Sequence, residues 1–255
     1  MRMIDQLKAR LNLKAVLRNV ELLPEIDDLS RELIKDWEIS IRLSIWRDTN
    51  ILLNFHNGRC TFLADTIEKG TVSLFFCSAA HLNNMMENNA SPLPLSGFTR
   101  LGFLKTEFSK LTSRLEYFLK PPSDVVQDDR HKMINLSLAL STAVFAIPEL
   151  LQLDPVSRRI APQLSAGTLQ LSVLPEGPYA YVIYDGKGGA KAFTGKAARP
   201  EALLTFRNPE IAQLLVDGTL DSFGAVAKGD IQLRGKIPLI DHTNVILDQI
   251  PKYLQ

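Results

Sequence analysis

Histidine, cysteine and acidic residues are the side chains of this sequence that could hold a metal ion or take part in catalysis. The four histidines are scattered: no two are four residues apart, and none has a carboxylate at ligand spacing. Zinc and iron sites need several such side chains converging on one point. The sequence therefore predicts neither a metal nor a cofactor, and it predicts structural or surface roles for His56, His81, His131 and His242.

Nucleophilic catalysis is equally unsupported by the residue pattern. Asp241-His242 lies at a predicted helix start, and no Gly-x-Ser-x-Gly segment supplies a serine for a triad. The glycine-rich residues 185–189 lack the spacing of a phosphate-binding loop and lie between two predicted strands, so we interpret them as a hairpin turn. Cys60 and Cys77 have no neighbour predicted to activate a thiolate, and we interpret both as small apolar side chains. We expect a protein that is not an enzyme.

Composition and charge are those of an ordinary globular protein. The 255 residues are 45% apolar and 22% charged, with a formal net charge of +1. This length suffices for one or two domains with their own cores, and the composition argues against a disordered chain or a general polyanion-binding protein. The basic clusters are Arg158-Arg159 and the set Lys187, Lys191, Lys196 and Arg199. We identify no base-stacking platform in either cluster and therefore predict no nucleic-acid partner.

The sequence also carries no recognisable export or membrane segment. Residues 1–8 are interrupted by charges and lack the apolar stretch of a secretory signal. The run from Met133 to Ile147 is shorter than the ~20 residues that cross a bilayer, and it ends at Pro148, so we interpret it as a buried helix. Two cysteines cannot form a disulfide framework and fit a reducing compartment. We therefore expect a cytoplasmic location.

Similar landmarks occur in the same order in both halves of the chain, which indicates a tandem duplication. Residues 41–45 and 169–173 both alternate apolar and polar side chains, as half-buried strands do. Asn57-Gly58 and Asp185-Gly186 follow these strands at the same offset, and both dipeptides favour a type I′ hairpin turn. Each half is therefore predicted to run from a helix through several strands to a helix.

Later landmarks extend the repeat. Ser78 and Asn208 stand where helix N-caps are expected. We predict a last strand in each half, followed by a closing helix: Gly97 to Leu101 and then Phe108 to Leu119, and Gly229 to Leu233 and then Leu239 to Leu254.

Paired prolines, Pro121-Pro122, separate the two halves and should stop the first closing helix. We assign residues 1–122 to a first module, 123–130 to a linker and 131–255 to a second module.

The pattern around residues 214–235 resembles that of a known family. Leu214 to Leu220 reads as a helix end followed by glycine, and Ala225 to Gly235 contains a Gly-x-Ile-x-Leu-x-Gly strand. This is similar to the C-terminal pattern of the sterol carrier protein type 2 family. The resemblance covers Met133 to Leu254 well and the first half more loosely, since Asn88 to Leu95 departs from the pattern.

The resemblance implies an α+β fold. It implies two similar modules, each with a mixed, largely antiparallel five-stranded sheet covered by helices. It also implies an apolar tunnel that holds a sterol, a fatty acyl chain or a related lipid, and no catalysis. The candidate tunnel-lining residues are Phe206, Ile211, Leu214, Leu215, Phe223, Val226, Ile246 and Ile250. The same apolar residues would equally well fill a closed core, because periodicity does not distinguish the two.

Two functions remain open at this point. The first is non-catalytic binding or transfer of a lipid, with transient membrane contact through the basic residues between 185 and 199. The alternative is an interaction or scaffold protein that keeps the fold without a working pocket and binds a protein partner.

Overall fold

The computed structural model describes residues 2–122, 128–216 and 219–254 of the chain. The chain divides into two compact units, Met1–Val125 and Val126–Gln255. Most of the predicted linker, residues 123–127, lies outside the described residues. Its remaining part is not an extended linker, because Asp128 caps a helix that begins at Asp129.

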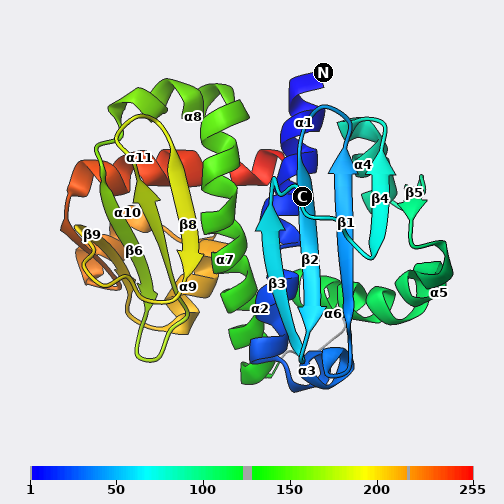
Figure 1. The fold of residues 1–255 in the computed structure, drawn as a ribbon. Coiled ribbons are helices and arrows are strands. Elements are labelled where there is room, and N and C mark those ends of the chain that lie inside the picture. Colours follow the sequence, from blue (N-terminus) through cyan, green and yellow to red (C-terminus); the bar gives the residue numbers. More distant parts are fainter. Residues whose placement is uncertain (1, 123–127, 217–218, 255) are drawn as a thin grey trace. The chain divides into compact units, whose positions relative to one another are not determined.

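The first unit begins with helices, continues with four strands and ends with further helices around a fifth strand (Figure 1). Its elements are α1 (Arg2–Leu11), the π-helix η1 (Asn12–Val16), α2 (Asn19–Ile26), α3 (Asp28–Ile34), β1 (Ile39–Ile45), β2 (Asn50–His56), β3 (Arg59–Ala64), β4 (Val72–Phe76), α4 (Ala79–Met86), β5 (Leu93–Ser96), η2 (Phe98–Arg100), α5 (Leu101–Phe103), η3 (Leu104–Phe108) and α6 (Ser109–Leu119).

The second unit follows the same order, with one additional helix before its last strand. Its elements are α7 (Asp129–Leu153), α8 (Pro155–Ile160), η4 (Ala161–Gln163), β6 (Gly167–Val173), β7 (Tyr179–Tyr184), β8 (Ala190–Thr194), β9 (Ala202–Phe206), α9 (Pro209–Val216), α10 (Ser222–Lys228), β10 (Ile231–Gly235), α11 (Ile237–Leu247) and η5 (Ile250–Lys252).

Both units contain a five-stranded mixed sheet with the same strand order. The first sheet is β3-β2-β1-β4-β5, and the second, written in the same direction, is β8-β7-β6-β9-β10. The central strands pair in parallel, β1 with β4 and β6 with β9, and every other neighbouring pair is antiparallel. The predicted α+β class, with two similar five-stranded modules, is therefore confirmed.

One face of each sheet forms the core. The side chains of β1 alternate between buried and half-buried along the whole strand, with Ile39, Ile41, Leu43 and Ile45 inward. Helices α1 and α2 lie behind the first sheet in Figure 1, and α9, α10 and α11 lie behind the second. This alternation is what a sheet covered on one side requires.

The connection between the third and fourth strands must pass across the sheet, because two strands separate them. A residue at the middle of each central strand holds this connection on the outer face. In the first unit the Arg42 guanidinium donates to the Glu68 carbonyl. In the second, the Gln170 amide donates to the Gly195 carbonyl (3.3 Å) and accepts from the Ala197 N–H (2.7 Å).

Helix α7 confirms the buried helix predicted over Met133–Ile147, but it does not end at Pro148. It continues to Leu153, and Asp154 provides the cap of the next helix. Among the described helices, α7 alone is long and apolar enough to cross a membrane, and 72% of its most apolar window is buried. Buried core helices of globular proteins have the same length and composition.

Two predicted elements of the repeat are wrong in detail. The strand predicted from Gly97 to Leu101 instead starts at Leu93 and stops at Ser96, because Gly97 adopts φ +75° and turns the chain into η2. The turn at Asp185-Gly186 is not a two-residue hairpin. The Asp185 carboxylate accepts the backbone N–H groups of Lys187 (2.7 Å) and Gly189 (2.9 Å), which stabilises a longer loop.

A buried aspartate joins the first helices of each unit to its last. In the first unit Asp27 is 3% exposed and accepts the N–H (3.0 Å) and hydroxyl (2.6 Å) of Ser30, which caps α3. Arg114 of α6 donates to the same carboxylate through Nε and through Nη2, the latter at 2.8 Å.

The second unit repeats this arrangement with a different partner. Asp154, 2% exposed, accepts the N–H (2.7 Å) and hydroxyl (2.9 Å) of Ser157, and Tyr253 donates its hydroxyl to the other carboxylate oxygen at 2.7 Å. Burial alone would raise the pKa of both aspartates, but the hydrogen bonds outweigh burial and hold each pKa below its usual value. Each carboxylate therefore stays charged and fixes a helix start to a closing segment.

The replacements Asp27→Asn and Asp154→Asn should each lower the free energy of unfolding of their own unit by about 2 kcal/mol at neutral pH, because a neutral amide replaces a charged acceptor. The lowered pKa values mean that this stability is present above the unfolded pKa of about 3.9 and is lost as the pH falls below it. The Asn variants should lack that part of the acid dependence.

Urea unfolding measured between pH 3 and 7 tests this prediction. Both tryptophans, Trp37 and Trp46, belong to the first unit. Their fluorescence should therefore detect Asp27→Asn, whereas Asp154→Asn should be detected only by circular dichroism. An acid dependence identical to that of the unmodified protein in both variants would contradict the assignment.

Candidate functional site

The candidate site is the interior of the second unit between its sheet and helices α9, α10 and α11. Helix α9 packs on β9, α10 packs on β10, and α11 packs on both strands. Their facing side chains are apolar and buried, namely Phe206, Ala212, Ala225, Ile231, Leu239, Ile240 and Ile246. This region has the apolar chemistry that a lipid chain requires.

A cap residue that is recognisable in the sequence determines where α9 begins. Asn208 caps the helix by accepting the Ile211 N–H at 2.9 Å, as predicted, and Ser78 caps the matching helix α4 by accepting the His81 N–H at 3.1 Å. The Gln213 amide of α9 then donates to Asn135 of α7 at 3.2 Å.

The matching helix of the first unit is held by a similar amide pair. Asn12 donates to the Asn83 side chain at 3.5 Å, and Asn83 donates to the Asp5 carbonyl at 3.0 Å. In both units, therefore, the helix after the fourth strand is attached to the first long helix.

Apolar side chains remain exposed where α9 ends and where α10 follows. Leu214 and Leu215 are each 41% exposed, and Val226 of α10 is 42% exposed. Leu215 lies three residues after the buried Ala212 and therefore on the same face of the helix. The inward face of α9 thus opens to solvent at its C-terminal end while keeping apolar side chains there.

The predicted tunnel residues divide into three groups. Phe206 and Ile246 are buried, whereas Leu214, Leu215 and Val226 are exposed. Ile211 and Ile250 are half-buried. Phe223 belongs to α10, but its side chain lies outside the described residues. The seven described side chains thus range from buried to exposed, and the role of the whole set in holding a ligand remains a prediction.

A buried polar pair stands within the apolar interior, and sequence reasoning missed it. Tyr184 of β7 contacts Thr243 of α11 with 2.8 Å between the hydroxyl oxygens, and the Thr243 hydroxyl donates to the Leu239 carbonyl at 2.7 Å. Tyr184 is therefore the donor within this pair. Burial raises the pKa of Tyr184, so the phenol remains protonated and does not act as a base. The signal in the sequence was a threonine within the apolar run Leu239–Leu247.

Reactive side chains do not gather elsewhere in the described residues. No group of three or more histidine, cysteine, aspartate or glutamate side chains within residues 2–122, 128–216 and 219–254 could hold a metal ion. Cys60 is buried, and burial raises the pKa of its thiol, which makes it a poor nucleophile. Cys77 is exposed, in contrast to the interpretation of both cysteines as core side chains.

The corresponding interior of the first unit is filled by aromatic rings. Trp37 packs edge-on against Phe55 (5.0 Å between centroids) and Phe103 (4.7 Å), and Phe55 packs against Phe108 (6.2 Å). Phe103 and Phe108 come from the helical segment after β5, which takes the place of the strand predicted there. In this aromatic cluster Trp37 and Phe55 are buried, whereas Phe103 and Phe108 are half-buried. The first unit also has exposed apolar side chains of its own, such as Leu95 and Phe98.

Comparison with known proteins finds similar structures. No family model and no curated protein matches the sequence. Among solved structures, the sterol carrier protein domain 2 of Helicoverpa armigera is 18% identical, with a TM-score of 0.33, and the match covers 46% of this chain and 91% of that one. The chain is similar to sterol carrier protein 2 domains.

Further solved structures give the same result. Sterol carrier protein 2 like 2 from Aedes aegypti is 22% identical, with a TM-score of 0.30, and the match covers 41% of this chain and 92% of that one. A UbiJ-SCP2 ubiquinone synthesis protein is 11% identical, with a TM-score of 0.32, and the match covers 40% and 86%. The sterol carrier resemblance expected from residues 214–235 is thus also found among solved structures.

Small side chains on the inner face of the second sheet lie where the first sheet has large ones. Strand register places Ala192 opposite Val182, where the first unit pairs Phe62 with Leu53. Helix α7 packs on both β7 and β8. We infer that alanine at this position lets α7 approach the sheet closely, and that a ligand beneath α9 and α10 would not extend under α7.

Replacing Ala192 with Leu should therefore destabilise the second unit by about 1–3 kcal/mol, because the added carbons meet a packed helix. Cys60→Leu makes a comparable enlargement at a buried position of the first unit's edge strand, beneath α2, and should destabilise that unit instead. Urea unfolding followed by circular dichroism measures both. A neutral or stabilising effect of Ala192→Leu would mean that the ligand space extends beneath α7.

Proposed function

We propose that the second unit binds a lipid, such as a sterol or a fatty acyl chain, in the apolar interior beneath α9 and α10, without catalysis. The observation that carries the proposal is the open end of α9, where Leu215 shares a helix face with buried Ala212 yet is 41% exposed. A single exposed leucine is common on protein surfaces, but Leu215 is one of three consecutive exposed apolar residues, Leu214 to Val216, and contiguous exposed apolar side chains of this kind mark ligand or partner sites.

An apolar site can bind a lipid without polar groups that hold its headgroup. Each methylene group removed from water contributes about 0.8 kcal/mol, so burying about ten of them gives about 8 kcal/mol before the losses of ordering the ligand. Micromolar binding requires about 8 kcal/mol net, so a longer chain that buries more methylene groups would reach it after those losses. Tyr184 and Thr243 bond to each other and to a backbone carbonyl, so they remain satisfied whether or not a lipid is present.

We do not assign lipid binding to the first unit. Trp37, Phe55, Phe103 and Phe108 pack edge-on against one another there, in place of the aliphatic side chains that cover the second sheet. We assign lipid binding to the second unit alone, and a structural role to the first.

The alternative function is protein binding by the same exposed apolar side chains, with no lipid inside. Exposed apolar clusters on soluble proteins mark either ligand sites or partner sites. Leu214, Leu215, Val216 and Val226 would then be covered by a partner protein. A protein partner retained in purification together with an empty interior would favour this alternative.

Replacing Leu215 with Asp should weaken lipid binding at least tenfold, because a charge at the margin must lose its water when the chain enters. Binding is measured by titrating the purified full chain with a naturally fluorescent polyunsaturated fatty acid. Native mass spectrometry of the protein from its own host would show in parallel whether a lipid is retained.

Met86→Asp is the matched control. Met86 ends the corresponding helix of the first unit and is 42% exposed, so the change in charge and exposure is the same. It should leave the affinity unchanged. Equal loss in both variants, or no uptake of fatty acid by the unmodified protein, would overturn the assignment of binding to the second unit.

A further inference from the structure

The outer face of the β7–β8 hairpin combines aromatic, aliphatic and basic side chains. Across the two strands Tyr181 pairs with Phe193 and Ile183 pairs with Lys191. The pair between them, Val182 and Ala192, is buried on the opposite face. Strand alternation therefore places Tyr181, Phe193, Ile183 and Lys191 together on the outside, where Ile183 is 41% exposed and Lys191 is exposed.

The sequence interpretation of this region needs a correction. It found no aromatic residues among the basic residues from 187 to 199. Strand pairing brings Tyr181 beside Phe193, which lies between Lys191 and Lys196 in the chain. Lys196 also lies over the ring of Tyr179, with Nζ 4.2 Å from the ring centroid. The basic residues and the aromatic residues thus form one surface.

The orientation of the rings decides what this surface can bind. Tyr181 and Phe193 stack with 5.0 Å between centroids and 19° between planes, which is close to the spacing of neighbouring strands. Rings stacked across two strands cover one face of each other, so neither offers that face to a ligand. A nucleic-acid base needs an open ring face to stack on, so this geometry disfavours single-stranded nucleic acid.

Charge on this surface is positive. Lys191 and Arg199 form no ion pair with any residue that the structure describes. The acids in the adjoining segments are Glu176, Asp185 and Glu201. The Asp185 carboxylate accepts two backbone N–H groups of its own loop, and Glu201 accepts the Thr168 N–H.

We propose that this hairpin face docks the second unit on an anionic lipid surface, and this rests on the proposed lipid-binding function. Stacked aromatic rings and an exposed isoleucine fit the interfacial zone of a bilayer, where apolar and polar groups meet. The lysines meet the anionic headgroups. Docking is weak and reversible, because the contribution of each basic residue is screened by salt.

Sedimentation with phosphatidylcholine vesicles, with and without phosphatidylglycerol, tests the docking across a salt series. The triple variant Lys187→Gln, Lys191→Gln and Lys196→Gln should reduce partitioning onto anionic vesicles by about 10- to 100-fold. It should also flatten the salt dependence.

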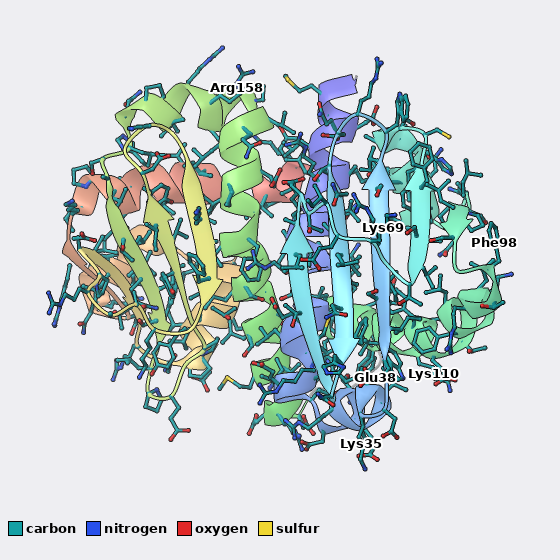
Figure 2. All side chains as sticks on the ribbon, in the orientation of Figure 1. Lys35, Glu38, Lys69, Phe98, Lys110 and Arg158 are labelled. Carbon is teal, nitrogen blue, oxygen red and sulfur yellow. The ribbon has the colours of Figure 1, made fainter. Side chains whose placement is uncertain are left out.

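The matched control removes the same charge from the first unit, with Lys35→Gln, Lys69→Gln and Lys110→Gln at the exposed positions labelled in Figure 2. It should bind as the unmodified protein does. Equal loss in both triple variants would show attraction by overall charge and would overturn the proposal.

A local probe gives a second readout. Ile183→Cys on a Cys77→Ser background carries an environment-sensitive dye at position 183, since Cys60 is buried. Its emission should shift to the blue on anionic vesicles, whereas a dye on Cys77 of the otherwise unmodified chain should not respond. No shift at position 183 contradicts docking by this face. If the protein retained a single-stranded oligonucleotide and did not bind vesicles, the partner of this face would be nucleic acid and the membrane proposal would be wrong.

Failure of docking and failure of lipid binding are separable. The triple lysine variant should still take up the fluorescent fatty acid, because its substitutions lie away from α9 and α10. If the unmodified protein docks but takes up no fatty acid, the proposed function fails and the docking face stands.

Discussion

A charged carboxylate held away from water is the interaction on which the architecture of each unit depends. Removing such a group from solvent is unfavourable unless hydrogen-bond donors replace the lost water. Asp27 and Asp154 meet this condition by accepting the cap hydrogen bonds of α3 and α8 and a third donor from the closing segment. One group thus fixes a helix start and the end of the unit at the same point, and the sheet lies between them.

The two units keep this frame and differ in what it encloses. In the first, the donor is the Arg114 guanidinium and the interior is packed with aromatic rings around Trp37. In the second, the donor is the Tyr253 hydroxyl, and apolar side chains remain exposed where α9 ends. The sheet order and the caps are common to both, so the difference in function that we propose rests on the side chains between helices and sheet.

Sequence patterns predicted most of the strands, both caps at Ser78 and Asn208, and the long buried helix, because those features depend on residues close together in the chain. They did not predict the end of α7, since the sequence alone does not show that a helix continues past Pro148. They also misplaced the last strand of the first unit, where the conformation of Gly97 decides the path. The Tyr184–Thr243 pair and the Tyr181–Phe193 stack depend on strand pairing and packing between distant segments, which local patterns do not contain.

The span of the carboxylate contacts has a consequence for the order in which each unit folds. The Asp27–Arg114 contact joins residues 87 apart in the chain, and the Asp154–Tyr253 contact joins residues 99 apart. The β1–β2–β3 and β6–β7–β8 meanders are built from neighbouring segments and lose little chain entropy when they form. The parallel fourth strand and the closing contact must follow, after a large loop has been closed. We therefore expect the local meanders to form before the closing contact, so that each aspartate carboxylate stays accessible to water until that contact forms.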